Sequence, residues 1–503
     1  MRKIKILSFI IAITLTAGML ASCKDKPAEP SSSGLAPSEV LSSDEGTGEL
    51  ENTSSIYDDD DVVGSQLLTP TSKSPTAVSS KPKTGNTVSA PTVSKNIEDS
   101  KAVLPKLNIT DKNLTICIDW GPDANWVKAW VSALNFCYPG FKLSWKQASP
   151  AQKASKLMVW AASDQSPDVI YIKPEESWPL LVNKNLVEPV DQYIDINSAF
   201  WGSVRNTMNG MKIDNKHHVM ISSIGHYGSV IYKRDVFTSK GWEDPTSLLF
   251  KDQWTWAKFE EYARNSTKIN AADPDKSNYG IAMGYAEPFV GTVGKDFIKY
   301  DTTNKKWVSN LNDSAIKDAI ALITSLGPNG NAYCDMTSSN ARDKVKSGQI
   351  AMLVTGEAMG LQYPDDSASG KLLEVPLPRY TKSSTYYHFG TGTAFAIPKG
   401  AKNPIGAVAL ANSVRAMSIL DLKMPKDPSV KEMQTEEQKN IWKYVDNKVT
   451  YVNMDYRRLS EDSTGPNLKY SSIWGPGFLP PGESWSAVVA KREPTIMEAL
   501  KKH

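Results

Sequence analysis

Residues 106–503 are predicted to form an α/β fold of more than one domain, and three observations lead to this class. A chain of 503 residues is too long for one compact core. Beyond residue 106, stretches with the alternation of a strand are separated by stretches with the spacing of a helix, as in βαβ units. All fourteen tryptophans lie between Trp120 and Trp485, so the amino-terminal part differs from the rest of the chain in composition.

The first strands of this body are predicted in order along the chain. The stretch 114–119 alternates and is rich in β-formers, 141–145 alternates in the same way, and 169–172 is a short apolar run. Strands separated by helices favour a mostly parallel sheet. In such sheets, ligands bind beyond the carboxyl ends of the strands.

The helices between these strands are predicted from spacing and capping residues. Apolar residues recur at helical spacing over 126–137, and a second helix is predicted to begin at 149–150, a serine N-cap followed by proline. Further on, Thr255 can cap a helix, with Trp254 packed onto Phe259. We therefore interpret the Trp-Thr-Trp motif at 254–256 as structural, with ligand stacking as the alternative.

A glycine-containing segment is predicted to cross between two lobes. Residues 219–232 are two apolar stretches joined through Gly225, His226, Tyr227 and Gly228. Glycine permits a sharp backbone bend, which such a crossing requires.

Composition narrows the class of protein. Hydrophobic residues at 40% and charged residues at 22% are typical of a soluble globular protein and exclude a collagen-like, wholly disordered or polytopic membrane chain. Lysine and arginine number 57 against 55 aspartates and glutamates. Because a nucleic-acid site needs a clustered basic excess, we expect no nucleic-acid partner.

The amino terminus has the layout of an export signal. An apolar stretch at 6–20 follows basic residues at positions 2, 3 and 5, and it is too short for a permanent membrane span. The next residues end at Cys23, and the order Leu-Ala-Ser-Cys resembles the lipobox of bacterial lipoproteins. This resemblance implies that residues 1–22 are a signal peptide and that lipid on Cys23 anchors the protein to the outer face of a membrane. A plain secretory signal and a fortuitous cysteine are the alternatives.

Residues 23–105 are predicted to be the lipidated cysteine and a disordered tether. From 24 to 104 the sequence is rich in Ser, Thr, Pro and charged residues, and its only aromatic residue is Tyr57. Such a composition buries too little apolar surface to offset chain entropy. A flexible chain of this length reaches on the order of 50 Å, which holds a domain away from a membrane.

The remaining cysteines are Cys117, Cys137 and Cys334 once Cys23 carries lipid. An odd number cannot pair completely, and a body of this size needs no disulfide. We expect three buried thiols, and a bridge between Cys117 and Cys137 is the alternative.

Six segments in a fixed order resemble a known family. They read SPDVI at 166–170, LVEPVDQYID at 186–195, VIYKRDVF at 230–237, WTWAKF at 254–259, SGQIAM at 347–352 and AIPKGAKNP at 396–404. Together they are similar to the extracellular solute-binding proteins of ABC importers, in the carbohydrate-binding family related to maltose-binding protein. The resemblance implies a two-lobed, type II periplasmic-binding-protein-like clamp with a multi-strand hinge. Lobe 1 is then expected at about 106–225 and 390–420, and lobe 2 at about 229–388 with much of 421–503.

The resemblance also implies a ligand cleft between the lobes. Planar aromatic rings pack on the faces of sugars, while carboxylates and amides bind sugar hydroxyls. The positions that match the family's cleft are Asp119, Trp120, Asp123, Glu175, His226, Tyr227, Tyr285, Glu287 and Trp474. A hinge hydrogen bond is the alternative role for His226, and whether 355–359 lines the cleft stays open.

The function that follows is capture of an oligosaccharide or related polyhydroxylated solute for delivery to ABC permease subunits. We expect a monomer with no enzymatic activity, cofactor or metal. The sequence has no Gly-x-Ser-x-Gly, His-Glu-x-x-His, P-loop or Gly-x-Gly-x-x-Gly motif. Two alternatives stay open: a cell-surface glycan hydrolase using Asp119 and Glu175, and a surface adhesin or sensor that binds without transport.

Overall fold

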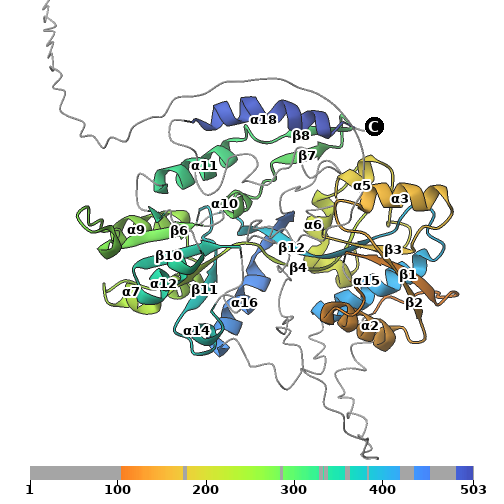
Figure 1. Cartoon of the computed structure of the whole chain (residues 1–503), viewed down its shortest axis with the longest axis horizontal. Helices are drawn as coiled ribbons and strands as arrows, with labels where there is room; N and C mark the ends of the chain where they lie inside the picture. The colour runs from red at the N-terminus through yellow and green to blue at the C-terminus, as the bar shows by residue number, and fades with distance from the viewer. Residues whose placement is uncertain are drawn as a thin grey trace, which may run out of the picture. The chain divides into compact units, whose positions relative to one another are not determined.

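The computed structural model describes residues 104–119, 121–173, 178–283, 287–327, 332–333, 338–356, 363–381, 384–419, 435–453 and 483–501 (Figure 1). All of them belong to one of the two units into which the chain divides, Asp59–His503. They form two β-sheets, a separate hairpin and the helices that pack around them. Within these ranges, none of the helices has the length and apolar character that crossing a membrane would need.

The first sheet contains the strands predicted near the start of the body. As described, its six strands are β1 (Asn113–Ile118), β2 (Lys142–Gln147), β3 (Val169–Ile172), β4 (Met220–His226), β12 (Tyr387–Ala396) and β13 (Thr450–Asn453). β1 lies between β2 and β3 and runs parallel to both. β12 runs antiparallel to β3 and β4 and parallel to β13. The predicted strands are confirmed and run parallel to one another as expected, but the sheet as a whole is mixed, because the long β12 runs antiparallel to β3 and β4.

The second sheet is also mixed. As described, its five strands in spatial order are β11 (Leu373–Pro376), β5 (Ser229–Tyr232), β10 (Ile350–Thr355), β6 (Tyr279–Met283) and β9 (Ala332–Tyr333). β6 runs parallel to β10 and β9, whereas β5 is antiparallel to β10 and β11. Every residue of β10 is buried, as expected of a central strand with both faces covered.

The chain passes from the first sheet to the second within two residues. β4 ends at His226, and β5 begins at Ser229. Between them, Gly228 has a φ of +94°, and a Cβ at this position would lie 2.4 Å from Pro288 Cβ. Only glycine combines this backbone conformation with this close approach, so the predicted crossing is confirmed at Gly228.

Helices around the first sheet include a long buried one. They are α2 (Asn125–Cys137), α3 (Lys153–Ala162), α5 (Leu180–Asn183), the 3₁₀ helix η1 (Ala199–Val204), α6 (Arg205–Gly210) and α15 (Pro404–Ile419) (Figure 1). α15 is buried on all sides from Gly406 to Ala416, which explains its lack of a polar face. The helix predicted to begin at 149–150 begins at Lys153 instead, because residues 149–152 form a turn closed by the Gln152 N–H and the Ser149 carbonyl.

Helices around the second sheet and the hairpin complete the described body (Figure 1). They are α7 (Arg234–Thr238), α8 (Pro245–Phe250), α9 (Trp256–Ser266), η2 (Pro274–Lys276), α10 (Glu287–Gly291), α11 (Ser314–Leu326), α12 (Ser338–Ser347), α14 (Pro364–Ala368), α16 (Glu436–Lys448) and α18 (Trp485–Ala499). The hairpin pairs β7 (Ile298–Asp301) with β8 (Lys306–Ser309).

The start of α9 confirms the structural interpretation of the 254–256 motif. The Thr255 hydroxyl accepts from the Lys258 N–H as an N-cap. The Trp254 ring packs edge-on against Phe259, and its indole N–H donates to the Pro376 carbonyl at 2.8 Å. Trp256 is buried and donates to the Thr292 hydroxyl. Both tryptophans are therefore engaged in the core of this part of the fold.

The two described cysteines, Cys117 and Cys137, form no disulfide bond. Cys117 is buried in β1, as predicted, whereas Cys137, at the end of α2, is only partly buried, so the expectation of a buried thiol is wrong there. The alternative of a bridge between them is wrong. Burial raises the pKa of the Cys117 thiol to about 11, so it stays protonated and unreactive. Cys23 and Cys334 lie outside the described residues.

Candidate functional site

The carboxyl ends of β1 and β3 bring two buried charged residues to one edge of the first sheet. Asp119 follows β1, and Lys173 follows β3, which is parallel to β1. Parallel strands end at a common edge, which is where ligands bind in α/β sheets. This edge is therefore the part of the first sheet where a site is expected.

The carboxylate of Asp119 is paired inside the protein. Lys153 at the start of α3 places its Nζ 2.5 Å from Asp119 Oδ1, and their side chains are 1% and 4% exposed. The Lys153 ammonium also lies 5.3 Å from the centre of the Tyr171 ring, on β3. The ion pair thus joins α3 to the end of β1. The role of Asp119 as a ligand contact stays a prediction.

The loop after β1 is tied down at its base. The Asp119 carbonyl accepts a hydrogen bond from the Gln147 side chain at 3.1 Å, and the Ala124 N–H donates to the Gly121 carbonyl. Asp123 lies on this loop and is exposed. The loop therefore presents the exposed Asp123 carboxylate on an anchored backbone. A carboxylate in this position can accept hydrogen bonds from hydroxyl groups.

His226 lies at the crossing between the sheets. Its ring stacks on Trp442 of α16, with ring centres 3.9 Å apart and planes 14° apart. Burial lowers the pKa of His226 to about 4, so the ring is neutral at pH 7. The ring has no hydrogen-bond partner among the residues that the structure describes, so its two nitrogens remain able to donate one and accept one hydrogen bond.

Tyr227 connects the crossing to the end of β10. It is buried, and a Cβ on Gly356, the residue after β10, would lie 3.0 Å from its hydroxyl oxygen. Glycine at 356 therefore makes room for the Tyr227 ring. Thr355 and Gly356 lie beside the crossing as a result, whereas 357–359 lie outside the described residues.

The other predicted ligand residues are not placed. Trp120, Glu175, Tyr285 and Trp474 lie outside the described residues, and for Glu287 the structure gives only its position at the start of α10. Of the predicted set, the structure brings His226 and Tyr227 together at the crossing and puts Asp119 and Asp123 on one loop.

Sequence reasoning missed the side chains that hold these residues. Lys153 stands on the buried stripe of α3 with Ala154 and Leu157, and a lysine on an apolar stripe is a usable signal for a buried ion pair. Trp442 follows Ile441 in a charged helix, and nothing in its own segment indicates that it reaches His226.

His217, outside the crossing, is held by structural partners. His217 Nδ1 lies 2.6 Å from an Asp191 carboxylate oxygen, and its Nε2 lies 3.0 Å from Asn209 Oδ1. Within the described ranges, no group of three or more His, Cys, Asp or Glu side chains is arranged to hold a metal ion.

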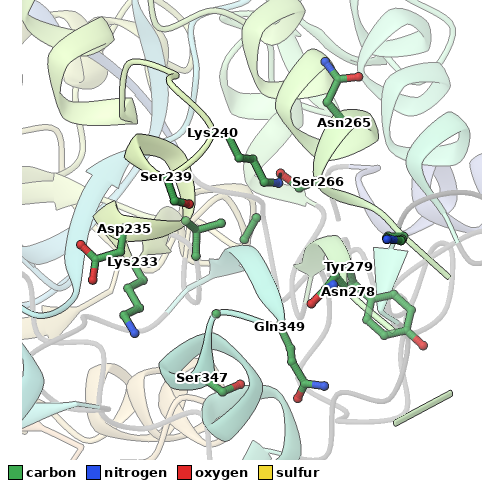
Figure 2. Close-up of a pocket in the computed structure, with 14 residues that line it drawn as sticks. Lys233, Asp235, Ser239, Lys240, Asn265, Ser266, Asn278, Tyr279, Ser347 and Gln349 are labelled. Carbon is green, nitrogen blue, oxygen red and sulfur yellow. Dashed lines mark hydrogen bonds between the residues drawn. The ribbon is translucent and has the colours of Figure 1, made fainter. Parts of the chain in front are cut away.

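A cavity of about 480 Å³ lies elsewhere, at the amino ends of β6 and β10 (Figure 2). Its lining includes Lys233, Lys240 and Lys268. None of the residues that the sequence predicts as ligand contacts lines it.

Two mixed sheets joined by a short crossing, with buried polar groups at the strand ends, define a two-lobed α/β binding protein. The sequence model for bacterial extracellular solute-binding proteins matches residues 129–418, more than half of the chain. The protein therefore belongs to that family.

Solved structures agree with the predicted fold class. The sugar-binding protein MalE from Xanthomonas citri has a TM-score of 0.53 at 15% identity, over 77% of this chain and 97% of that one. A sugar transporter from Rhizobium etli, in an open conformation, has a TM-score of 0.51 at 17% identity, over 68% and 89%. No curated protein sequence matches the chain. At these identities the likeness shows the fold, and the two-lobed α/β prediction is confirmed.

Proposed function

We propose that the protein is the lipid-anchored receptor of an ABC import system, which captures an oligosaccharide or related polyhydroxylated solute outside the cell and delivers it to permease subunits. The observation that carries this proposal is membership of the extracellular solute-binding family over 129–418. The likeness of the fold to a sugar-binding protein supports sugars as the first ligand class to test.

The crossing supplies a physical mechanism. A solute that touches residues of both sheets favours the arrangement in which both sets of contacts form, by its differential affinity for that state. Gly228 and its short connection let the two sheets change their relative angle with few backbone rotations. No bond is made or broken, and a permease reads the closed shape.

The ligand contacts that we propose lie on both sides of the crossing. Neutral His226, exposed Asp123 and the hydroxyl-bearing Tyr227 offer donors and acceptors to sugar hydroxyls. Buried polar groups that match hydroxyls discriminate steeply against solutes lacking them. The remaining proposed contacts are Asp119, Trp120, Glu175, Tyr285, Glu287 and Trp474.

The proposed organisation of the chain follows the sequence. Residues 1–22 are the signal peptide, Cys23 carries lipid, and 24–105 form the tether. The solute-binding body is 106–503, with lobe 1 at about 106–225 and 390–420. The switch from β4 to β5 at 226–229 supports a lobe boundary there.

The test is calorimetric titration of the intact protein with a panel of plant and host oligosaccharides, with chromatography of every mixture. We expect saturable binding of one glycan without new products. Release of smaller sugars would overturn the receptor in favour of a hydrolase, and Asp119 and Glu175 would then be the first residues to replace.

A matched set of variants locates the site. His226→Phe keeps an aromatic ring against Trp442 but removes both ring nitrogens, and we expect about tenfold weaker binding. Asp123→Asn should also weaken it. Asp164→Asn, an exposed carboxylate paired with Lys402, is the control and should bind normally. Equal affinity in all three would place the ligand away from the crossing.

A further inference from the structure

The cavity at the amino ends of β6 and β10 is separate from the proposed cleft. Thr355, at the carboxyl end of β10, pairs with Ser229 beside the crossing, whereas Gln349 and Ala351 at the other end line the cavity. A strand rises about 3.3 Å per residue, so the length of β10 puts about 20 Å between the two places. One ligand of ordinary sugar size cannot occupy both.

The lining of the cavity is polar and carries more positive than negative charge. It includes Lys233, Lys240 and Lys268 against a single carboxylate, that of Asp235. Among the residues that the structure describes, none of the three ammonium groups is paired with a carboxylate. Figure 2 shows the Asp235 carboxylate pointing away from Lys240 and Ser266. An anion in the cavity would therefore meet unneutralised lysines.

Lys240 is held in place at the edge of the cavity without a carboxylate. Its Nζ donates to the Ser266 hydroxyl at 3.1 Å, and it lies 4.6 Å from the centre of the Trp242 ring. Ser266 is buried, so this contact fixes where the ammonium sits. Partial burial also lowers the pKa of Lys240, as expected of an ammonium that lacks an anionic partner.

The rest of the lining suits hydroxyl groups. Three serines, two asparagines, a glutamine and a tyrosine contribute side chains that donate or accept hydrogen bonds. The space of about 480 Å³ is open to solvent on one side, since half of its lining residues are exposed.

We propose that this cavity is a second binding site, distinct from the cleft, for a small sugar that carries one anionic group, either phosphate or carboxylate. The lysines bind the anion, and the serine and amide side chains bind the hydroxyls. This inference goes beyond the proposed function and does not depend on it, because the two sites share no residue.

The test is titration of the intact protein with glucose 6-phosphate, glucuronate, inorganic phosphate and glucose, at low and at high salt. We expect both anionic sugars to bind, glucose not to bind, and phosphate alone to bind more weakly because it lacks the hydroxyls. Added salt should weaken binding, since part of the attraction is between charges. The tighter of the two anionic sugars identifies the anionic group.

Three lysine variants connect the binding to the cavity. Lys240→Met and Lys268→Met should each weaken the anionic sugars about tenfold, the usual effect of losing one charged hydrogen bond. Lys251→Met removes the same charge from a residue that pairs with Glu243 outside the lining, and it should bind normally. Thermal melting of each variant confirms that it is folded.

The proposal is overturned by any of three results: folded protein that binds neither anionic sugar at millimolar concentration, glucose that binds as tightly as glucose 6-phosphate, or equal affinities in all three lysine variants. His226→Phe distinguishes the cavity from the cleft. It should weaken oligosaccharide binding without changing the affinity for glucose 6-phosphate, so the two binding-site proposals can be refuted independently.

Discussion

Replacing Lys153 of the buried Lys153–Asp119 pair should lower the free energy of unfolding substantially. In Lys153→Met, the Asp119 carboxylate remains at a place where its side chain is 4% exposed and no longer faces an ammonium 2.5 Å away. Breaking a buried pair by removing one partner costs about 3 to 5 kcal/mol, because the remaining buried charge loses its counter-ion. Against a typical total stability of about 5 to 15 kcal/mol, this is a large fraction.

The assay is chemical unfolding of the intact protein followed by tryptophan fluorescence, with the denaturant slope checked for each variant. Lys156→Met is the matched control, because Lys156 is on the same helix and, within the described ranges, donates to the Gln147 carbonyl and pairs with no carboxylate. It should cost less than about 1 kcal/mol.

The double variant tests the reason for the loss. Asp119→Asn combined with Lys153→Met removes both charges, so it should be more stable than the sum of the single losses by about 2 kcal/mol or more. If Lys153→Met behaves like Lys156→Met, or if the two single effects simply add, the buried ion pair is not what anchors the end of β1.

Two further predictions concern pH and the crossing. Burial lowers the pKa of His388 to about 3 from 6.5, so its neutral form stabilises the fold fully above pH 6.5, and this contribution falls as the pH drops towards 3. Between pH 6.5 and 4.5, His388 alone should account for a loss of about 2 to 3 kcal/mol, and the buried His226 adds a loss of the same sign. A flat unfolding free energy over that range would contradict this. Gly228→Ala should destabilise the protein by more than about 2 kcal/mol, because the new Cβ meets Pro288 at positive φ. Gly241→Ala has a positive φ and open space, so it reports the backbone cost alone, and an equal loss in both variants would rule out the contact.

Local patterns were enough to predict much of the fold. The alternation at 114–119 and the apolar run at 169–172 became β1 and β3, and Thr255 caps α9 as expected. These features depend on neighbours within a few residues. The start of α3 was misplaced because a serine followed by proline serves a turn as well as it serves an N-cap.

Long-range partners could not be predicted in the same way. The antiparallel return of β12 beside β3 joins segments more than two hundred residues apart, and nothing within either strand states its direction. The stacking of Trp442 on His226 depends in the same way on where α16 packs. The side chains that position the site residues can therefore be identified only from the three-dimensional packing, even where the site residues themselves are recognisable in the sequence.

The cavity could not be predicted from the sequence for the same reason. Lys233 and Lys240 flank α7, and Lys268 follows α9, so the three lysines come from two separate and ordinary charged stretches. Only the packing of α7 and α9 against the amino ends of β6 and β10 brings them around one space. A charge pattern read along the chain contains no such signal.

Closure of the two lobes on a solute can be measured by small-angle X-ray scattering of the intact protein with and without its oligosaccharide. We expect a smaller radius of gyration in the presence of the ligand. The radius should stay unchanged when His226→Phe is mixed with the same sugar at a concentration below the dissociation constant of the variant. Saturated binding with no change in the radius would show that the solute does not bring the two lobes together.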